Sequence, residues 1–87
     1  MPHIYCEVIN RKGMHARAAA KVVSLVDQFD GQVTFQLEDR IAPANSLIKL
    51  LTLNAPQGSK IKITVSGKDE KPLIKALKQL FVEGFGE

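Results

Sequence analysis

A regular alternation of apolar and polar side chains in three short segments is the feature that most constrains the fold of this chain. Every second residue is apolar in residues 60–65, and the same pattern holds in residues 33–38 and 4–9. Successive side chains of a strand point to opposite faces, so each segment predicts a strand that buries one face. A sheet with one apolar face needs one covering layer of helices, which predicts a two-layer α+β fold.

Two longer segments carry apolar residues at the spacing of an amphipathic helix. The first begins at Ala16 and is predicted to end at the turn signal Asp30-Gly31. The second follows Gly67-Lys68-Asp69, has Pro72 in its first turn and is ended by Gly84. The predicted buried stripes are Ala19, Val22, Val23, Val26 and Phe29 in the first helix, and Leu73, Ile74, Leu77, Leu80 and Phe81 in the second.

A short helix and a short strand complete the predicted order. Asn45-Ser46 has the chemistry of a helix N-cap, so a helix is expected from Leu47 to about Asn54. A turn at residues 38–40 leads into a strand at Ile41-Ala42. The resulting order, βαββαβα, predicts a four-stranded antiparallel sheet with three helices on one face, formed by a single domain that spans residues 1–87.

The composition limits the function classes that fit. The 87 residues include 12 Lys and Arg and 9 Asp and Glu, a formal charge of +3, without a run of five like charges. This balance supports at most a weak attraction to acidic partners. Cys6 is the only cysteine, which rules out an internal disulfide. We see no signal peptide and no apolar stretch long enough to cross a membrane, and we expect a cytoplasmic monomer that does not insert into membranes.

The segment from Gly13 to Arg17 lies where the first predicted strand gives way to the first helix. His15 is expected at or just before the helix N-terminus, where the first backbone N–H groups have no helical partner. Those groups and the helix dipole favour an anion, and the Arg17 guanidinium is suited to phosphate oxygens. Since a neutral imidazole is a nucleophile near neutral pH, the segment is suited to carry a phosphoryl group on His15, held by Arg17 and the backbone N–H groups of Ala16 and Arg17.

Each of these residues alone is weak evidence for a phosphoryl site. A histidine at a helix start is more often a cap or a packing residue, and a lone arginine is usually a solvated charge. Gly13 permits the close backbone approach that places the ring at the surface. The small residues that follow Arg17 are expected to leave the site open to a partner protein.

The run Gly-Met-His-Ala-Arg-Ala-Ala-Ala at residues 13–20 closely resembles the active-site signature of HPr, the histidine-containing phosphocarrier family of the bacterial phosphoenolpyruvate-dependent phosphotransferase system. Residues 45–51 resemble the second motif of that family, in which a serine opens a short apolar helix. The length and the order of elements are also similar to HPr from end to end. The last eight residues, and Ser46 with the apolar residues after it, resemble the nitrogen-related NPr members.

The resemblance implies a phosphoryl carrier rather than a stand-alone turnover enzyme. Its acceptor would be Nδ1 of His15, charged by enzyme I and discharged to an enzyme IIA protein or domain, for sugar uptake or for regulation. Arg17 would help to hold and release the phosphoryl group. The signature usually has proline where this chain has Ala18, a departure expected to tune the site rather than abolish it. No cofactor is implied, and His3, His15 and Cys6 lack the spacing of metal ligands.

Two further roles follow from the resemblance. Ser46 matches a serine that a dedicated kinase/phosphorylase phosphorylates in some bacteria, although its chemistry as an N-cap already explains a serine there. The expected contacts with partner proteins are Ala20, Leu47, Ile48 and Lys49. Leu50 and Leu51 fit the same surface or the core equally well.

Two other function classes stay open from the sequence. One is a regulatory docking module in which phosphorylation only switches the binding of a partner at the same surface. The other is a small basic nucleic-acid binder, supported only by the charge of +3. Because no strand face carries a row of exposed aromatic residues, we expect no nucleic-acid partner.

Overall fold

The structure is a computed structural model that describes residues 2–86. Its strands are β1 (His3–Glu7), β2 (Gly31–Leu37), β3 (Arg40–Pro43) and β4 (Lys60–Gly67). Its helices are α1 (Ala16–Val26), α2 (Leu47–Thr52) and α3 (Glu70–Val82), followed by a short 3-10 turn, η1 (Gly84–Gly86). The predicted order βαββαβα is therefore confirmed.

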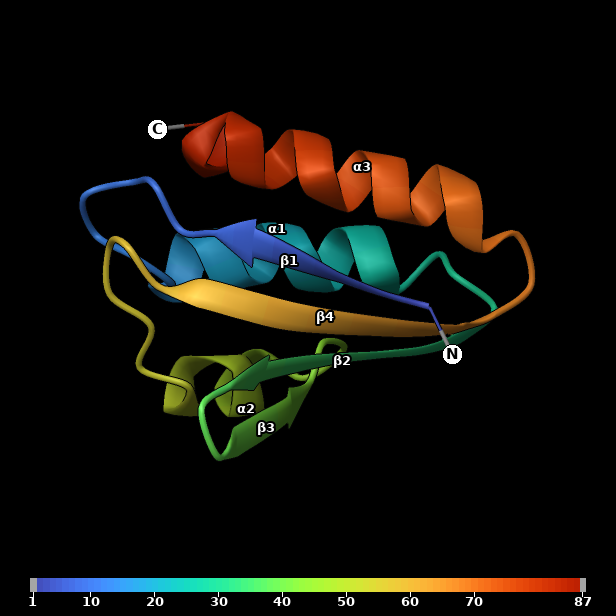
Figure 1. Cartoon of the computed structure of the whole chain (residues 1–87), viewed down its shortest axis with the longest axis horizontal. Coiled ribbons are helices and arrows are strands. Elements are labelled where there is room, and N and C mark those ends of the chain that lie inside the picture. Colours follow the sequence, from blue (N-terminus) through green and yellow to red (C-terminus); the bar gives the residue numbers. More distant parts are fainter. Residues whose placement is uncertain (1, 87) are drawn as a thin grey trace.

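The four strands form one antiparallel sheet in the order β1-β4-β2-β3 (Figure 1). The central strand β4 pairs with β1 through Cys6 and Ile61 and with β2 through Phe35 and Ile63. These registers align the apolar positions of neighbouring strands, so the apolar side chains share one face of the sheet.

The helices cover that apolar face. The side chains that the sheet buries are Cys6, Val33, Phe35, Leu37, Ala42, Ile61, Ile63 and Val65, and the helices bury Ala18, Ala19, Val22, Val26, Leu50, Leu73, Leu77 and Phe81 against them. Lys60 and Tyr5 lie exposed on the opposite side. Burial of a Leu or Phe side chain contributes roughly 1.5–3 kcal/mol, so this layer carries most of the stability of the fold.

Helix α1 is shorter than the sequence predicts. The Asp27 N–H still bonds to the Val23 carbonyl, but the Phe29 N–H bonds to Val26, a tighter turn that ends the helix at Val26. Phe29 therefore lies in the connection to β2, partly buried against the core, rather than on the helix. An apolar residue one turn beyond a helix can keep the helical spacing, which is why the pattern overestimated the length.

The C-terminal turn folds back onto the domain. Gly84 adopts a left-handed conformation with φ of +60° after α3, which confirms it as the residue that ends this helix. Phe85 then turns into the core and is fully buried, and the Lys21 ammonium donates a hydrogen bond to its carbonyl. The packing of Phe85 against Phe81 of α3 was not predicted. Within residues 2–86, the longest and most apolar helices still fall short of what a bilayer span requires.

Candidate functional site

His15 is the N-cap of α1, as the sequence predicts. Its backbone is extended, with φ of −91° and ψ of −180°, and helical geometry begins at Ala16. The backbone N–H of Arg17 donates a hydrogen bond to Nδ1 of the imidazole, with an N–N distance of 3.3 Å. A side chain that accepts from the second residue of the helix is the arrangement of an N-cap, here made by an imidazole nitrogen. The reactive candidate is thus fixed to the helix start through Nδ1.

The loop before His15 is tied to a distant part of the chain. Gly13 has φ of +68°, and a Cβ atom there would overlap the carbonyl oxygen of Ala55 and lie 3.0 Å from the Cα of Pro56. The Met14 N–H donates to that same Ala55 carbonyl at 2.9 Å. Only glycine satisfies both the left-handed backbone and the close approach to Ala55. These two constraints explain why the predicted tight turn at this position needs a glycine.

Asn10 is a site residue that the sequence analysis missed. It is 6% exposed, and its Nδ2 donates to the Gly13 carbonyl at 2.8 Å, while the Gly13 N–H donates back to the Asn10 carbonyl at 3.2 Å. An asparagine in the loop after a strand, three residues before a glycine, is a signal for such a turn. Asn10 was not among the site residues predicted from the sequence.

The first turn of α1 offers backbone donors beside the ring. The first bond between backbone groups of the helix runs from the Ala19 N–H to the His15 carbonyl at 2.9 Å. The earlier N–H groups, those of Ala16, Arg17 and Ala18, therefore have no carbonyl of their own helix as partner. Ala18 adds one donor that the usual proline of the family lacks.

The expectation that the small residues after Arg17 leave the site open is wrong for two of the three alanines. Ala18 and Ala19 are fully buried, because the helical period turns them towards the sheet, and Ala20 is the small residue that stays exposed. Access to His15 is thus not provided by a row of small surface residues. The exposed Arg17 lines a shallow hollow together with Ile9, Asn10, Arg11 and Lys12, which brings further cations to this edge of the site.

Helix α2 lies beside α1, at the end of the molecule where α1 begins (Figure 1). Its N-cap is Ser46, whose Oγ accepts a hydrogen bond from the Lys49 N–H at 3.3 Å, which confirms the predicted cap. The hydroxyl therefore has a structural role at the helix start.

The apolar residues of α2 divide between surface and core. Leu47 is 40% exposed, Ile48 is 73% exposed and Leu51 is 37% exposed, whereas Leu50 is fully buried. Of the two residues that the sequence left undecided, Leu50 therefore belongs to the core and Leu51 to the surface. With Ala20 and Lys49, both exposed, the three exposed side chains form a surface next to the start of α1 that we call the α1–α2 surface.

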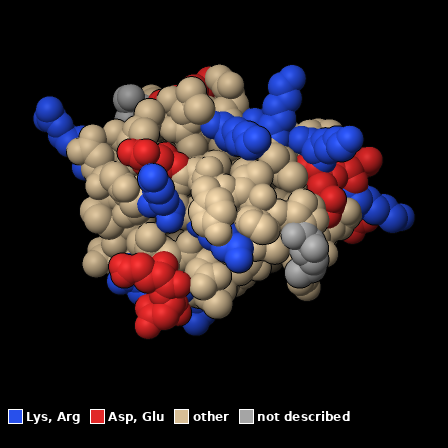
Figure 2. Space-filling model, viewed as in Figure 1, with Lys and Arg blue, Asp and Glu red and all other residues tan. Residues whose placement is uncertain are grey.

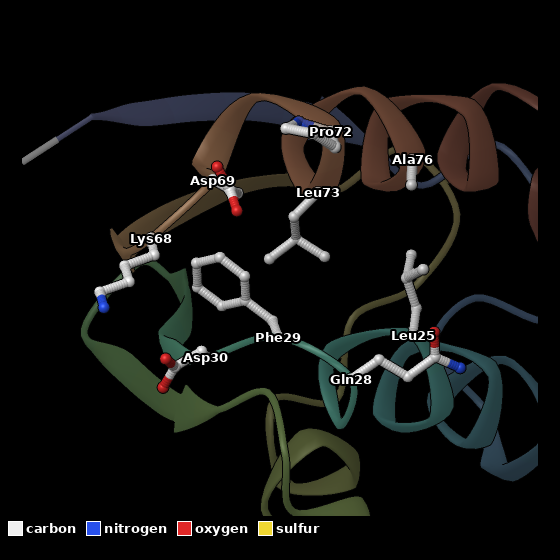
Figure 3. A pocket seen from close by; sticks show the side chains of 9 residues that line it. All are labelled: Leu25, Gln28, Phe29, Asp30, Lys68, Asp69, Pro72, Leu73 and Ala76. Atoms are coloured by element: carbon white, nitrogen blue, oxygen red, sulfur yellow. The ribbon is translucent and has the colours of Figure 1, made fainter.

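The other surface features of the domain do not form a second site near His15. On the face in Figure 2, Lys and Arg side chains are interspersed with Asp and Glu instead of forming one basic stripe. The hollow in Figure 3 lies between the C-terminal end of α1 and the start of α3, where Phe29 and Leu73 point towards each other, so it is remote from His15. Among residues 2–86, no group of three or more His, Cys, Asp or Glu side chains is placed to hold a metal ion.

The chain matches a family model and curated relatives over most of its length. The model, described as "PTS HPr component phosphorylation site", matches residues 4–83. The phosphocarrier protein NPr of Proteus mirabilis is 47% identical over 79 residues, which cover 90% of this chain and 88% of that protein. The NPr of Escherichia coli K12 is 38% identical over 82 residues, 93% of this chain and 91% of its own length. The phosphocarrier protein HPr of Xylella fastidiosa Temecula1 is 36% identical over 80 residues, 92% and 90% of the two chains.

Solved structures agree with the fold. An HPr structure from Thermoanaerobacter tengcongensis superposes with a TM-score of 0.93 at 33% identity, covering 100% of this chain and 98% of that one. The HPr of Bacillus anthracis gives a TM-score of 0.85 at 25% identity, with 92% and 95% of the two chains covered. With this agreement in sequence, length and three-dimensional arrangement, the chain belongs to the HPr family, the phosphocarrier proteins of the phosphotransferase system.

Proposed function

We propose that this chain is a cytoplasmic carrier that accepts a phosphoryl group from enzyme I on Nδ1 of His15 and passes it to an enzyme IIA protein or domain. The observation that supports this assignment most directly is the orientation of the ring at the start of α1. Nδ1 is held at an exposed hydrogen bond with the Arg17 N–H, whereas Nε2 is buried. Only Nδ1 faces the side from which a phosphoryl donor can approach.

The transfer exchanges one bond to phosphorus for another. The lone pair of Nδ1 forms the new P–N bond as the bond between phosphorus and the donor breaks, and the donor keeps that electron pair. The Arg17 N–H loses its nitrogen acceptor in this step and is placed to donate to a phosphoryl oxygen instead. The N–H groups of Ala16 and Arg17, the helix dipole and the Arg17 guanidinium then stabilise the new dianion.

The α1–α2 surface is proposed as the docking site for both partner proteins. Ile48 and Leu47 supply exposed apolar area on α2, which packs beside α1, and Ala20 adds a small exposed side chain on α1. Apolar side chains surrounded by polar ones are typical of the centre of a protein–protein interface. Lys49 and Arg17 add positive charge, which favours partners with acidic surfaces.

Regulation at Ser46 stays a prediction. A phosphate on Ser46 would lie at the start of α2, where backbone N–H groups tolerate an anion. The same negative charge would stand within the α1–α2 surface and would repel acidic partners. The role as N-cap explains the serine without any modification, so incubation with an HPr kinase is needed to decide between the two.

The test of the carrier proposal uses both histidines of the chain. Incubation with enzyme I and radiolabelled phosphoenolpyruvate should add one phosphate that is labile in acid and stable in alkali. A His15→Ala variant should take up none, whereas His3→Ala, which removes an exposed histidine on β1, should take up the full amount. Phosphate on the His15→Ala variant would refute the assignment of the acceptor.

A further inference from the structure

The edge of the sheet at β1 presents a row of outward backbone groups. Within residues 2–86, β1 is the outermost strand on its side and pairs with β4 alone. The Val8 N–H donates to the Ser59 carbonyl at 2.8 Å, directly beyond the last pair of this ladder. Bonding to one neighbour alternates along an antiparallel strand, so the even-numbered residues of β1 bond to β4. The N–H and C=O groups of His3, Tyr5 and Glu7 therefore point away from the sheet.

An apolar groove lies beside this edge, between β1 and α3, and we call it the β1–α3 groove. Its volume is about 360 Å³, and its apolar lining consists of Cys6, Tyr5, Ile9, Phe81 and Val82. Tyr5 is 65% exposed and Val82 is 69% exposed. The strand and the helix run side by side in the same direction (Figure 1). Exposed apolar side chains next to outward backbone groups are typical of a sheet edge that accepts a further strand.

Lysine side chains border the groove along α3. Lys78 lines it, and Lys75 and Lys71 lie three and seven residues earlier, on the same side of the helix. All three are exposed. Glu7 is the one acidic residue of the lining, and it lies opposite Lys60 on β4, which offsets its charge in part. The border of the groove is therefore positive.

The lysines decide which kind of strand fits this edge. A second copy of the chain would pair its own β1 here, centred on Tyr5. A two-fold axis normal to the joined sheet keeps both helix layers on one side, so the lysines of the two α3 helices would approach each other. Like charges placed in this way oppose pairing, whereas a segment with acidic residues is attracted by the same lysines.

We propose that the β1–α3 groove is a docking site for an extended acidic segment of another protein, which adds to the sheet beside β1. The outward backbone groups of His3, Tyr5 and Glu7 bind the backbone of that segment. The groove takes one of its apolar side chains, and the lysines of α3 bind its carboxylates. The groove shares no residue with the α1–α2 surface, so this interaction is distinct from the proposed transfer of phosphate.

The spacing of the lysines defines the sequence pattern of the partner. Along α3, Lys78, Lys75 and Lys71 lie about 6, 10 and 16 Å from Val82. Groove-facing residues of an added strand follow one another at about 7 Å. In the antiparallel direction, an apolar residue at Val82 therefore places the second residue after it near Lys78, and the fourth between Lys75 and Lys71. The expected pattern is an apolar residue followed by acidic residues at the second and fourth positions.

The first test is a titration with a seven-residue peptide followed by nitrogen-15 NMR. In the peptide, which is acetylated and amidated, threonine alternates with valine, glutamate and glutamate in that order. It should shift the amide signals of His3, Tyr5 and Glu7, and at saturation it should slow their exchange with solvent at least tenfold. Unshifted signals at millimolar peptide, or shifts confined to the α1–α2 surface, would overturn the proposal.

Two methylated forms of this peptide separate strand addition from attraction by charge alone. The threonines lie opposite His3, Tyr5 and Glu7, so their N–H groups face β1, whereas those of valine and glutamate face away. Methylation of the threonine nitrogens should weaken binding at least tenfold. Methylation of the valine and glutamate nitrogens should leave the Kd within twofold. If the two forms bind equally, the segment does not add to the sheet.

A charge exchange tests the lysines. Lys78→Glu should weaken binding of the glutamate peptide about tenfold and strengthen binding of a peptide with lysine in place of glutamate. The matched control is Arg40→Glu, which makes the same change of charge at an exposed residue of β3, on the opposite edge of the sheet. It should leave both Kd values within twofold. Equal effects of the two variants would show that only the net charge matters, and the proposal would fail.

Sedimentation of the protein alone tests the alternative occupant. The chain should remain a monomer, with the Tyr5 amide exchanging rapidly. A dimer in which this amide is protected would identify a second copy as the occupant and would refute the proposal of an acidic partner segment. None of these measurements involves phosphate, so they test the groove independently of the carrier proposal.

Discussion

Replacement of Gly13 by alanine tests the geometry that presents His15. Gly13 has φ of +68°, and a Cβ atom there would overlap the Ala55 carbonyl oxygen. A left-handed backbone costs an alanine about 1–2 kcal/mol. The overlap forces the loop away from Ala55 and breaks the 2.9 Å bond from the Met14 N–H, worth about 1 kcal/mol more.

Gly13→Ala should therefore destabilise the domain by about 2–3 kcal/mol, which corresponds to a fall of the melting temperature by roughly 10–20 °C for a chain of this size. Urea denaturation followed by circular dichroism measures the change in the free energy of unfolding. Because the displaced loop carries His15, phosphate uptake below the melting temperature should fall as well.

Gly58→Ala is the control for this prediction. Gly58 has φ of +94°, but a Cβ atom there would meet no atom within 4 Å. Its replacement imposes backbone strain without a clash, so it should cost only about 1–2 kcal/mol and leave phosphate uptake unchanged. Equal losses of stability in the two variants would show that the contact with Ala55 is unimportant, and the account of Gly13 would be wrong.

Three further predictions address the site, the surface of α2 and the buried thiol. Arg17→Lys keeps the charge but loses the planar donors, so phosphate uptake should fall about tenfold with a change in unfolding free energy below about 0.5 kcal/mol. Leu50→Ala should cost about 2–5 kcal/mol in urea denaturation, whereas Ile48→Ala should leave stability unchanged and weaken the binding of enzyme I in calorimetry, since Leu50 is buried and Ile48 exposed. Burial raises the pKa of the Cys6 thiol, opposed in part by the charge of Lys78. Alkylation of Cys6 by iodoacetamide at pH 8 should therefore be slower than that of a free thiol, speed up as the pH rises and reach the rate of a free thiol in denaturant.

The elements that the sequence predicted well are those whose signals are local. Alternation in residues 60–65 specifies β4, since a shift by one residue would bury Lys62 and expose Ile63. Ser46 was recognisable as a cap because its Oγ needs only the Lys49 N–H three residues on. Gly84 marked the end of α3 for an equally local reason, its left-handed backbone.

The features that escaped prediction depend on distant contacts. Nothing near Phe85 in sequence indicates that Lys21, 64 residues earlier, will bond to its carbonyl. Asn10 lies close to Gly84, at the other end of the chain, since a Cβ atom at Gly84 would stand 3.6 Å from the Asn10 Cβ. His15 could be placed at the helix start from sequence, but the orientation of its ring could not, because that depends on how the loop packs. Residue types near a site are thus easier to read from a sequence than the contacts that orient them.

A carrier that serves two partner proteins must keep its reactive nitrogen at the surface, where each partner can enclose it in turn. A surface side chain is normally free to rotate, and such rotation would slow every transfer. This domain meets both demands by dividing the environment of His15. Nε2 is buried, whereas Nδ1 lies at the start of α1 in an exposed hydrogen bond with the Arg17 N–H. Residues behind the ring should thus affect transfer with both partners alike, whereas exposed residues of α2 such as Ile48 should affect each partner differently, because each makes its own contacts with that surface.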